Sequence, residues 1–251
     1  MRLTIAPEIF ARFPDLEMGI VCARGIDNMG TDREIEAFFR HALLEAGLLL
    51  KLKPVEKDPT VLFYRDLLFK MGAAGAIPSM EARLAEVAAG IAAETESGKF
   101  SPGQTAGLVG VTALARKTPI TDLTRGAEIQ FRLPVFAFDM KTGNSEITVR
   151  ESNTSDTYEM EKGIDSISEK EPIFAFGTSV SVRHLFCEQG LTGAVTKETR
   201  DVLIALPCFS QNRRRAMSAR NEIARRIKDS FGRDTEADWL SSTAPDFVSG
   251  L

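Results

Sequence analysis

The chain has 251 residues, a formal net charge of −4, 43% hydrophobic residues and 26% charged residues. This composition is ordinary for a folded globular domain and argues against a disordered chain, and no apolar run approaches the roughly 20 residues that span a bilayer. The acidic balance argues against a protein that wraps nucleic acid over its whole surface, so any RNA contact would need a local basic patch.

The first half of the chain predicts two short strands followed by helices. Apolar runs predict strands over residues 3–5 and 18–23. Thr31 and Glu34 have the spacing of a capping box, and apolar residues then recur at the helical period as far as Leu50. Further helices are expected over residues 60–71, from Ser79 onward and over residues 105–116, with a loop at residues 94–104.

From residue 120 onward the pattern changes to short strands. They are predicted over residues 128–131, 135–138, 146–150, 172–176, 180–185 and 201–206, and the alternation in residues 146–150 is the clearest. Helices first and strands later predict an α+β fold, with helices packed on a mixed, mostly antiparallel sheet. We expect residues 1–232 to form a single domain and residues 233–251 to form a loosely ordered tail, with Trp239 as an anchor onto the body or onto another subunit.

Two segments carry unusual charge. Residues 151–171 hold seven acidic residues against two lysines, which indicates either a solvated loop-and-turn region or a wall that repels an RNA backbone. Residues 212–228 predict a basic amphipathic helix in which a single acid, Glu222, accompanies seven cations: Arg213, Arg214, Arg215, Arg220, Arg225, Arg226 and Lys228. This helix is interpreted either as a solvated face or as a surface for a phosphate backbone. An anionic membrane fits it less well, because its apolar stripe is alanine-rich and has no Trp.

Familiar catalytic signatures are absent from the sequence. It contains no phosphate-binding loop, dinucleotide fingerprint, nucleophile elbow or zinc helix, and we expect no cofactor and no metal. Three cysteines without C-x-x-C spacing, Cys22, Cys187 and Cys208, are expected to be reduced and buried. The N-terminus lacks a secretory signal pattern, so we expect a cytoplasmic protein.

Residues 120–139, ITDLTRGAEIQFRLPVFAFD, resemble the signature of the B-three/B-four domain, the editing module of the phenylalanyl-tRNA synthetase beta subunit, which also occurs as free-standing proteins. The matching residues are Asp122, Thr124, Pro134, Ala137, Phe138 and Asp139, whereas Arg125 replaces an Asn and Phe136 replaces a His. Three further stretches agree in order: residues 13–28, residues 65–82 with Arg65 and Glu81, and residues 180–199 with Gln189 and Gly190. The resemblance covers roughly residues 5–231 and implies the fold of that editing domain.

The resemblance also implies an activity and its residues. Editing is hydrolysis of the ester that joins a wrong amino acid to tRNA, and it needs a pocket, a positioned water and donors for the developing oxyanion. The implied catalytic residues are Thr124 and Glu188, and the implied substrate-binding residues are Asp122, Phe136, Ala137, Asp139 and Arg183. His184 is a further catalytic candidate, because it is one of two histidines and follows Arg183 in a predicted strand, where one of the pair should face a cleft. Turn and cap formation is the alternative for Asp122 and Asp139, and a structural role is the alternative for His184.

Three functions follow as hypotheses. The first is a free-standing tRNA-associated protein, either a hydrolase of mischarged aminoacyl-tRNA or an RNA-binding relative, whose partner is tRNA or aminoacyl-tRNA and not DNA. It would not be an amino-acid ligase. The second is a small-molecule, amino-acid binding or sensing module without RNA activity. The third is a subunit interaction domain, and the sequence leaves the oligomeric state open.

Overall fold

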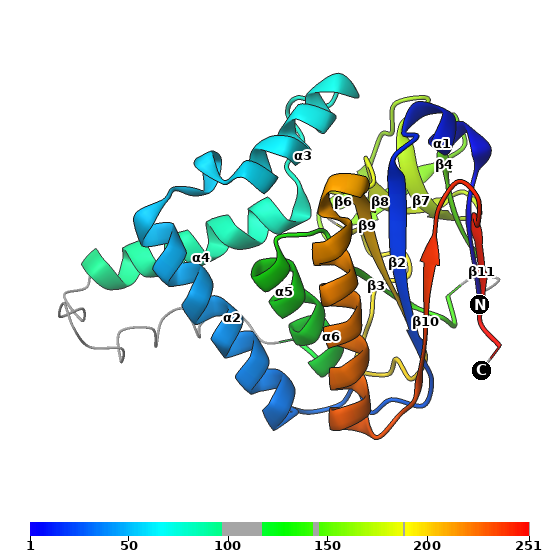
Figure 1. Ribbon diagram of the computed structural model, residues 1–251. Coiled ribbons are helices and arrows are strands. Elements are labelled where there is room, and N and C mark those ends of the chain that lie inside the picture. The colour runs from blue at the N-terminus through cyan, green and yellow to red at the C-terminus, as the bar shows by residue number, and fades with distance from the viewer. Residues whose placement is uncertain (97–116, 143–145, 188, 251) are drawn as a thin grey trace.

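A computed structural model describes residues 1–96, 117–142, 146–187 and 189–250 (Figure 1). The first half contains β1 (Arg2–Ile5), α1 (Pro7–Arg12), β2 (Leu16–Ala23), α2 (Arg33–Leu52), the 3-10 turn η1 (Val55–Lys57), α3 (Pro59–Lys70), α4 (Ser79–Glu96) and α5 (Pro119–Phe131). The predicted loop at residues 94–104 and helix at residues 105–116 fall mostly or wholly outside the described residues.

The second half contains most of the strands and one long helix. They are β3 (Phe136–Asp139), β4 (Glu146–Glu151), β5 (Thr157–Met160), β6 (Gly163–Asp165), β7 (Pro172–Phe176), β8 (Ser179–Arg183), β9 (Val202–Phe209), the 3-10 turn η4 (Ser210–Asn212), α6 (Arg213–Phe231), β10 (Thr235–Leu240) and β11 (Asp246–Val248). None of the helices in the described ranges combines the length and the apolar composition that a bilayer crossing needs.

The strands form two sheets. One has four strands in the order β10-β2-β9-β3, all paired antiparallel. The other has seven strands in the order β11-β1-β4-β7-β8-β5-β6, in which only β1–β4 and β5–β8 pair in parallel. The predicted α+β class with a mostly antiparallel sheet is therefore confirmed.

The four-stranded sheet lies between the helices and the other sheet. Every residue of β9 is buried. The buried stripe of α6, Ala216, Ala219, Ile223 and Ile227, covers one face, and Figure 1 shows α6 lying against β2 and β9. On the other face the ring of Phe138 in β3 stacks on Phe174 in β7 at 5.7 Å. A strand covered on both faces is apolar throughout, which explains the continuous apolar run of β9.

Residues 128–131 are helical, so the predicted strand there is wrong. They form the end of α5, which begins where Thr118 Oγ1 accepts a hydrogen bond from the Thr121 N–H and Pro119 occupies the first helical position. The helix ends at Arg132, whose φ is 52°. Four residues are too few to distinguish the apolar period of a strand, 2, from that of a helix, 3.6. The cap and the packing against α2 select the helix.

The cap of α2 also differs from the prediction. Asp32 rather than Thr31 caps the helix, since Asp32 Oδ1 accepts from the Ile35 N–H at 2.9 Å. The same oxygen accepts from the Ser230 hydroxyl at the end of α6. This contact between distant segments favours Asp32 over Thr31 as the cap. A rule based on local spacing cannot predict such a contact.

The acidic segment 151–171 contains β5 and β6 as well as turns. Two of its acids are buried in ion pairs: Asp156 with Arg150 in β4, and Glu171 with Arg183 in β8. These two carboxylates hold the seven-stranded sheet together and do not contribute to an exposed acidic wall.

Residues 233–250 include two strands that pair with the body of the protein, whereas the sequence predicted a loosely ordered tail. Strand β10 pairs with β2 over six residues, and β11 pairs with β1. Trp239 anchors this segment onto the body of the protein, because its indole N–H donates to Glu17 Oε2 at 2.7 Å. The sequence did not predict these strands because they lack a strong apolar run. They form through pairing with strands that are distant in the sequence.

Candidate functional site

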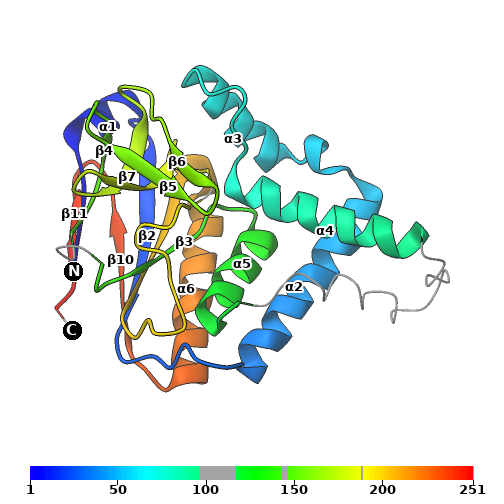
Figure 2. The ribbon, with the colours of Figure 1, turned by 180° about the vertical axis from the view of Figure 1, so that it is seen from behind.

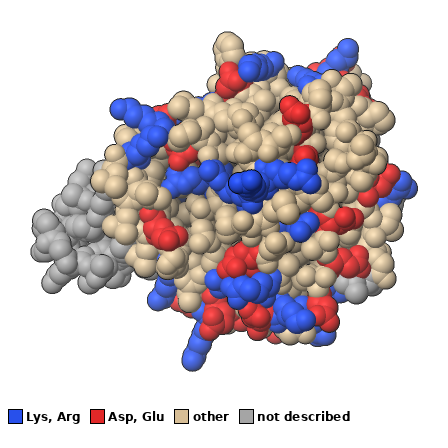
Figure 3. Space-filling model, viewed as in Figure 1, with Lys and Arg blue, Asp and Glu red and all other residues tan. Residues whose placement is uncertain are grey.

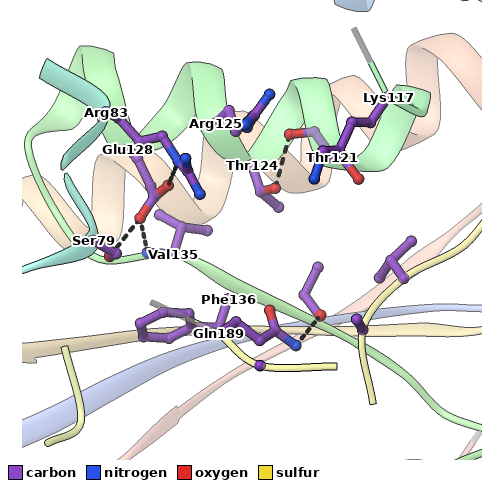
Figure 4. Close-up of a pocket in the computed structure, with 14 residues that line it drawn as sticks. Ser79, Arg83, Lys117, Thr121, Thr124, Arg125, Glu128, Val135, Phe136 and Gln189 are labelled. Carbon is purple, nitrogen blue, oxygen red and sulfur yellow. Dashed lines mark hydrogen bonds and ion pairs between the residues drawn. The ribbon is translucent and has the colours of Figure 1, made fainter. Parts of the chain in front are cut away.

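A cavity of about 160 Å³ lies between α4, α5, β3 and residues 189–195 (Figure 4). Figure 2 shows the arrangement of α4, α5 and β3 from behind. Its lining comes from segments far apart in the sequence: Ser79, Arg83, Lys117, Thr121, Thr124, Arg125, Glu128, Val135, Phe136, Ala137, Gln189, Gly190, Ala194 and Val195. We call it the α5–β3 pocket. It is smaller than the roughly 300–1,000 Å³ typical of sites for drug-sized molecules, which favours a small ligand.

Helix α5 supplies the upper wall of this pocket in Figure 4. Its apolar residues Ile120, Leu123 and Ala127 are buried in the core. Gly126 permits the close approach of α2, because a Cβ there would lie 2.7 Å from the ring of Phe38. Packing fixes the helix rotation and thereby directs Thr124 and Glu128 toward the cavity.

The hydroxyl of Thr124 lies against its own helix. It donates to the carbonyl oxygens of Ile120 and Thr121, both at 3.1 Å. The proton of this hydroxyl is thus used within the helix, and the lone pairs of its oxygen remain to accept a bond from a ligand or a water.

Glu128 is a buried carboxylate, with 4% of the residue exposed. Its Oε1 accepts hydrogen bonds from the Ser79 hydroxyl at 2.7 Å and the Val135 N–H at 3.3 Å, and its Oε2 lies 3.7 Å from Arg83 Nε (Figure 4). Burial raises the pKa of Glu128, although Arg83, Ser79 and Val135 oppose that rise. A carboxylate with a raised pKa is better suited to accept a proton near neutral pH than an exposed one.

Three cations line the same pocket. Arg83 donates to Glu86 Oε1 at 2.8 Å, and Figure 4 shows its guanidinium between α5 and β3. Burial lowers the pKa of Arg125, and the neighbouring charge of Arg83 acts in the same direction. Lys117 is exposed, and its backbone N–H donates to the buried Asp122 at 3.4 Å.

The opposite wall is formed by β3 and residues 189–195. Phe136 is buried against Phe174, with 5.9 Å between the ring centroids. Gln189 holds the second segment to β3, because its Nε2 donates to the Ala137 carbonyl at 3.0 Å. Gly190 permits a close approach of the same segment to β5, since a Cβ there would lie 2.6 Å from the Glu159 carbonyl oxygen. These contacts are a physical reason for a Gln-Gly pair at this position.

The structure brings some of the predicted site residues together. Thr124, Phe136 and Ala137 all line the α5–β3 pocket. Asp122 is buried on α5, next to the start of that helix. Asp139 makes a turn, because its Oδ1 accepts from the Lys141 N–H and its Oδ2 from the Thr199 hydroxyl. Glu188 lies outside the described residues.

Arg183 and His184 lie at a different cavity, of about 440 Å³, which they line with Tyr158 and Cys187 among others. Arg183 makes two hydrogen bonds of 2.7 Å to Glu171, and His184 Nε2 lies 3.5 Å from the same carboxylate. The predicted strand ends at Arg183 because His184 and Leu185 have φ values of 49° and 63°. Burial lowers the pKa of His184, which keeps the ring neutral at pH 7.

Most of the predicted RNA-binding cations on α6 have partners within the protein. Arg213 pairs with Glu17, Arg225 and Arg226 both pair with Glu222, and Lys228 pairs with Asp234. Arg220 lies over the ring of Trp239, and Arg215 donates to the Thr60 hydroxyl.

Arg214 differs from these cations, since it is exposed and makes no hydrogen bond or ion pair with another described residue. Figure 3 shows Lys and Arg side chains in a row across the middle of the face seen there, with acidic and basic side chains mixed below it. This face is therefore basic along that row and mixed in charge below it.

Seven pocket residues that carry a charge or a hydrogen-bonding side chain were not among the predicted site residues, namely Ser79, Arg83, Lys117, Thr121, Arg125, Glu128 and Gln189. A helical interpretation of residues 119–131 would have found three of them. Thr121 and Glu128 lie three positions before and four positions after Thr124 and share its side of a helix, and Arg125 lies four positions after Thr121. No spacing rule connects Arg83 or Gln189 to these residues. Within the described ranges, no group of three or more His, Cys, Asp or Glu side chains is placed to hold a metal ion.

Comparisons with known proteins add little. No protein-family profile matches the chain, and no curated protein matches it. Among solved structures, the chain is similar to an N-terminal fragment of the phenylalanyl-tRNA synthetase beta subunit from Pyrococcus horikoshii, at 12% identity and a TM-score of 0.38, with 48% of this chain and 43% of that chain covered. The match thus spans less than half of either chain, and a similarity this weak carries no argument about activity.

Proposed function

We propose that the protein is a tRNA-associated protein whose α5–β3 pocket receives the aminoacylated end of a tRNA. The observation that carries this proposal is the convergence of two resembling motifs: Thr124 and Ala137 from one, and Gln189 with Gly190 from another, line one cavity. Motifs that matched by chance would have no reason to meet in space. We propose further that residues 1–232 and the C-terminal strands act as one domain, since one cluster of buried side chains runs through both sheets and the helices and includes Leu240 and Phe247.

Two groups in the pocket suit hydrolysis of an aminoacyl ester. The Arg83 guanidinium can donate to the oxygen that becomes negative when water attacks the ester carbonyl. Glu128 is the carboxylate that can accept a proton from that water, with a pKa raised by burial. Thr124 would orient the water through its free lone pairs. No covalent nucleophile is required.

The test is the decay of a panel of aminoacyl-tRNAs with and without the protein. We expect faster loss of at least one ester, and we expect Thr124→Val to slow that loss because valine keeps the shape and removes the oxygen. Thr148→Val on β4 is the matched control and should leave the rate unchanged. Unaltered decay across the whole panel, together with no tRNA binding, would rule the proposal out.

Contact with the phosphate backbone is tested separately. Arg214 is the cation of α6 that is exposed without a described partner, so Arg214→Gln should weaken tRNA binding and reduce its salt dependence. Lys162→Gln, in the turn between β5 and β6, removes the same charge elsewhere and should have no effect.

A second function is favoured by the paired cations of α6. Because Glu17, Glu222, Asp229 and Asp234 pair with four of the seven cations, the helix offers less charge to RNA than its sequence suggests. This supports an amino-acid binding module without RNA activity. Free amino acids would then raise the melting temperature, whereas tRNA would not.

A further inference from the structure

A cavity of about 380 Å³ lies where α1, α3 and the end of β9 meet. We call it the β9-end cavity. Its lining combines three aromatic rings, Phe13, Phe63 and Phe209, with polar side chains that include Asp15 and Gln211. A largely apolar cavity of this size with a few polar groups has the form of a small-molecule site. It shares no lining residue with the α5–β3 pocket.

Phe63 is the most accessible of the three rings. Phe13 and Phe209 are buried, with 8% and 7% exposed, whereas Phe63 is partly exposed. Its ring meets those of Tyr64 and Phe209 edge-to-face, at interplanar angles of 67° and 79°. Among the described residues no aromatic ring stacks parallel on Phe63. A flat aromatic ligand would therefore supply a stacked contact that the protein itself does not make.

Two charged residues line the cavity, and Asp15 is the one whose side chain has no partner among the described residues. Arg12 donates to the Lys170 carbonyl at 2.8 Å and pairs with Glu151 at 3.5 Å. Asp15 is exposed and its carboxylate makes no hydrogen bond or ion pair within the described ranges. The Ser210 N–H donates to the Asp15 carbonyl oxygen at 3.3 Å, so the backbone holds this carboxylate beside the end of β9.

A free carboxylate next to an aromatic wall favours a flat ring that carries N–H donors along one edge, since these form charge-assisted hydrogen bonds. Guanine presents its N1–H and its 2-amino group side by side, and the two oxygens of Asp15 can accept from both. Adenine and cytosine offer one amino group beside a ring nitrogen lone pair, and uracil offers one N–H between two carbonyls. Gln211 can donate to the guanine O6 through its amide.

We propose that the β9-end cavity binds a guanine base, with its ring stacked on Phe63 and its N1–H and 2-amino groups donating to Asp15. This goes beyond the proposed function and does not depend on it, because the α5–β3 pocket is a separate cavity. Two sources share this chemistry, a free guanine nucleotide and an unpaired guanine in an RNA strand.

The experiment measures binding of guanosine, inosine and adenosine to the full-length chain by calorimetry. Inosine differs from guanosine only by the absence of the 2-amino group. The variants are Asp15→Asn and Phe63→Leu. Their matched controls are Glu8→Gln, which removes an exposed charge on α1, and Phe69→Leu, which removes an exposed ring on α3, and neither position lines the cavity.

Guanosine should bind on the order of tenfold more tightly than inosine, and Asp15→Asn should remove that difference. Phe63→Leu should weaken binding of both nucleosides on the order of tenfold, because it removes the stacking surface and keeps an apolar side chain. Both controls should bind as the wild type does. Since Asp15 is exposed, its variant is expected to fold even if Phe63→Leu does not.

Equal binding of guanosine and inosine, tighter binding of adenosine, or no binding of any nucleoside would overturn the inference. A preference for guanosine that survives Asp15→Asn would place the base elsewhere and would also overturn it.

Two further arms separate the sources and the two proposals. Guanosine monophosphate is compared with a single-stranded trinucleotide that has guanine between two uridines: the tighter ligand identifies the source as a free nucleotide or as RNA. Binding of tRNA is followed in parallel by gel shift. If guanosine binds and tRNA does not, the proposed function fails while the inference survives. If tRNA binds and no nucleoside does, the inference fails while the proposed function survives.

Discussion

The Ser79 hydroxyl donates a 2.7 Å hydrogen bond to Glu128 Oε1, and this bond joins the first residue of α4 to the pocket side of α5. Both residues are buried, with 4% exposed in each case. A buried carboxylate that loses a donor bears the full cost of its desolvation, so this contact affects both the stability of the fold and the charge state of the pocket.

Ser79→Ala should lower the free energy of unfolding by about 1–3 kcal/mol, because Glu128 loses its shortest hydrogen bond without gaining water. Urea denaturation monitored by circular dichroism measures this change. Ser218→Ala, at an exposed position of α6, should change stability by less than about 0.5 kcal/mol. Equal effects of the two substitutions would show that the Ser79 contact contributes nothing.

Glu128→Gln should change how stability depends on pH. The folded state raises the pKa of Glu128 through burial, so between the ordinary pKa and the raised one the folded state binds more protons than the unfolded state. The wild-type chain therefore loses stability as pH rises through that interval, and a glutamine, which resembles the protonated acid, does not. The difference in unfolding free energy should move in favour of the variant as pH increases. A difference that stays constant with pH would contradict this prediction.

Glu171→Gln should be strongly destabilising. The carboxylate is 1% exposed and makes two hydrogen bonds to Arg183, so its removal leaves a largely buried guanidinium uncompensated, at a cost of about 3 kcal/mol. Asp66→Asn breaks an exposed ion pair with Lys70 and should cost less than about 1 kcal/mol. Thermal and urea unfolding of both variants measure these changes in stability. A small loss of stability in the Glu171 variant would show that water replaces the hydrogen bonds of Glu171 to Arg183.

Trp239→Phe should loosen β10. The indole N–H donates to Glu17, and the ring lies between Arg213 and Arg220. Losing the hydrogen bond should cost about 1–2 kcal/mol and increase amide hydrogen exchange in residues 235–240. Thr243→Ala, in the turn that follows, should leave exchange in β10 unchanged. Unaltered exchange in the Trp239 variant would mean that pairing with β2 alone holds the strand.

The sequence by itself determined the class of the fold and much of its local structure. The apolar runs of β2 and β9, the alternation of β4 and the stripe of α6 are local patterns, and each appears in the structure where the pattern predicted it. The buried state of Cys22, Cys187 and Cys208 was also predicted correctly, because three separated cysteines without metal spacing behave as small apolar residues.

Only the tertiary structure decided which side chains share a site. Residues 128–131 became helix through the Thr118 cap and packing on α2, and β10 became a strand through its pairing with β2. The α5–β3 pocket joins Arg83, Glu128 and Gln189 from three distant segments, while Arg183 and His184 face another cavity. Periodicity and spacing report contacts within a few residues along the chain, whereas the charge and shape of a pocket are set by residues brought together through packing of the whole core.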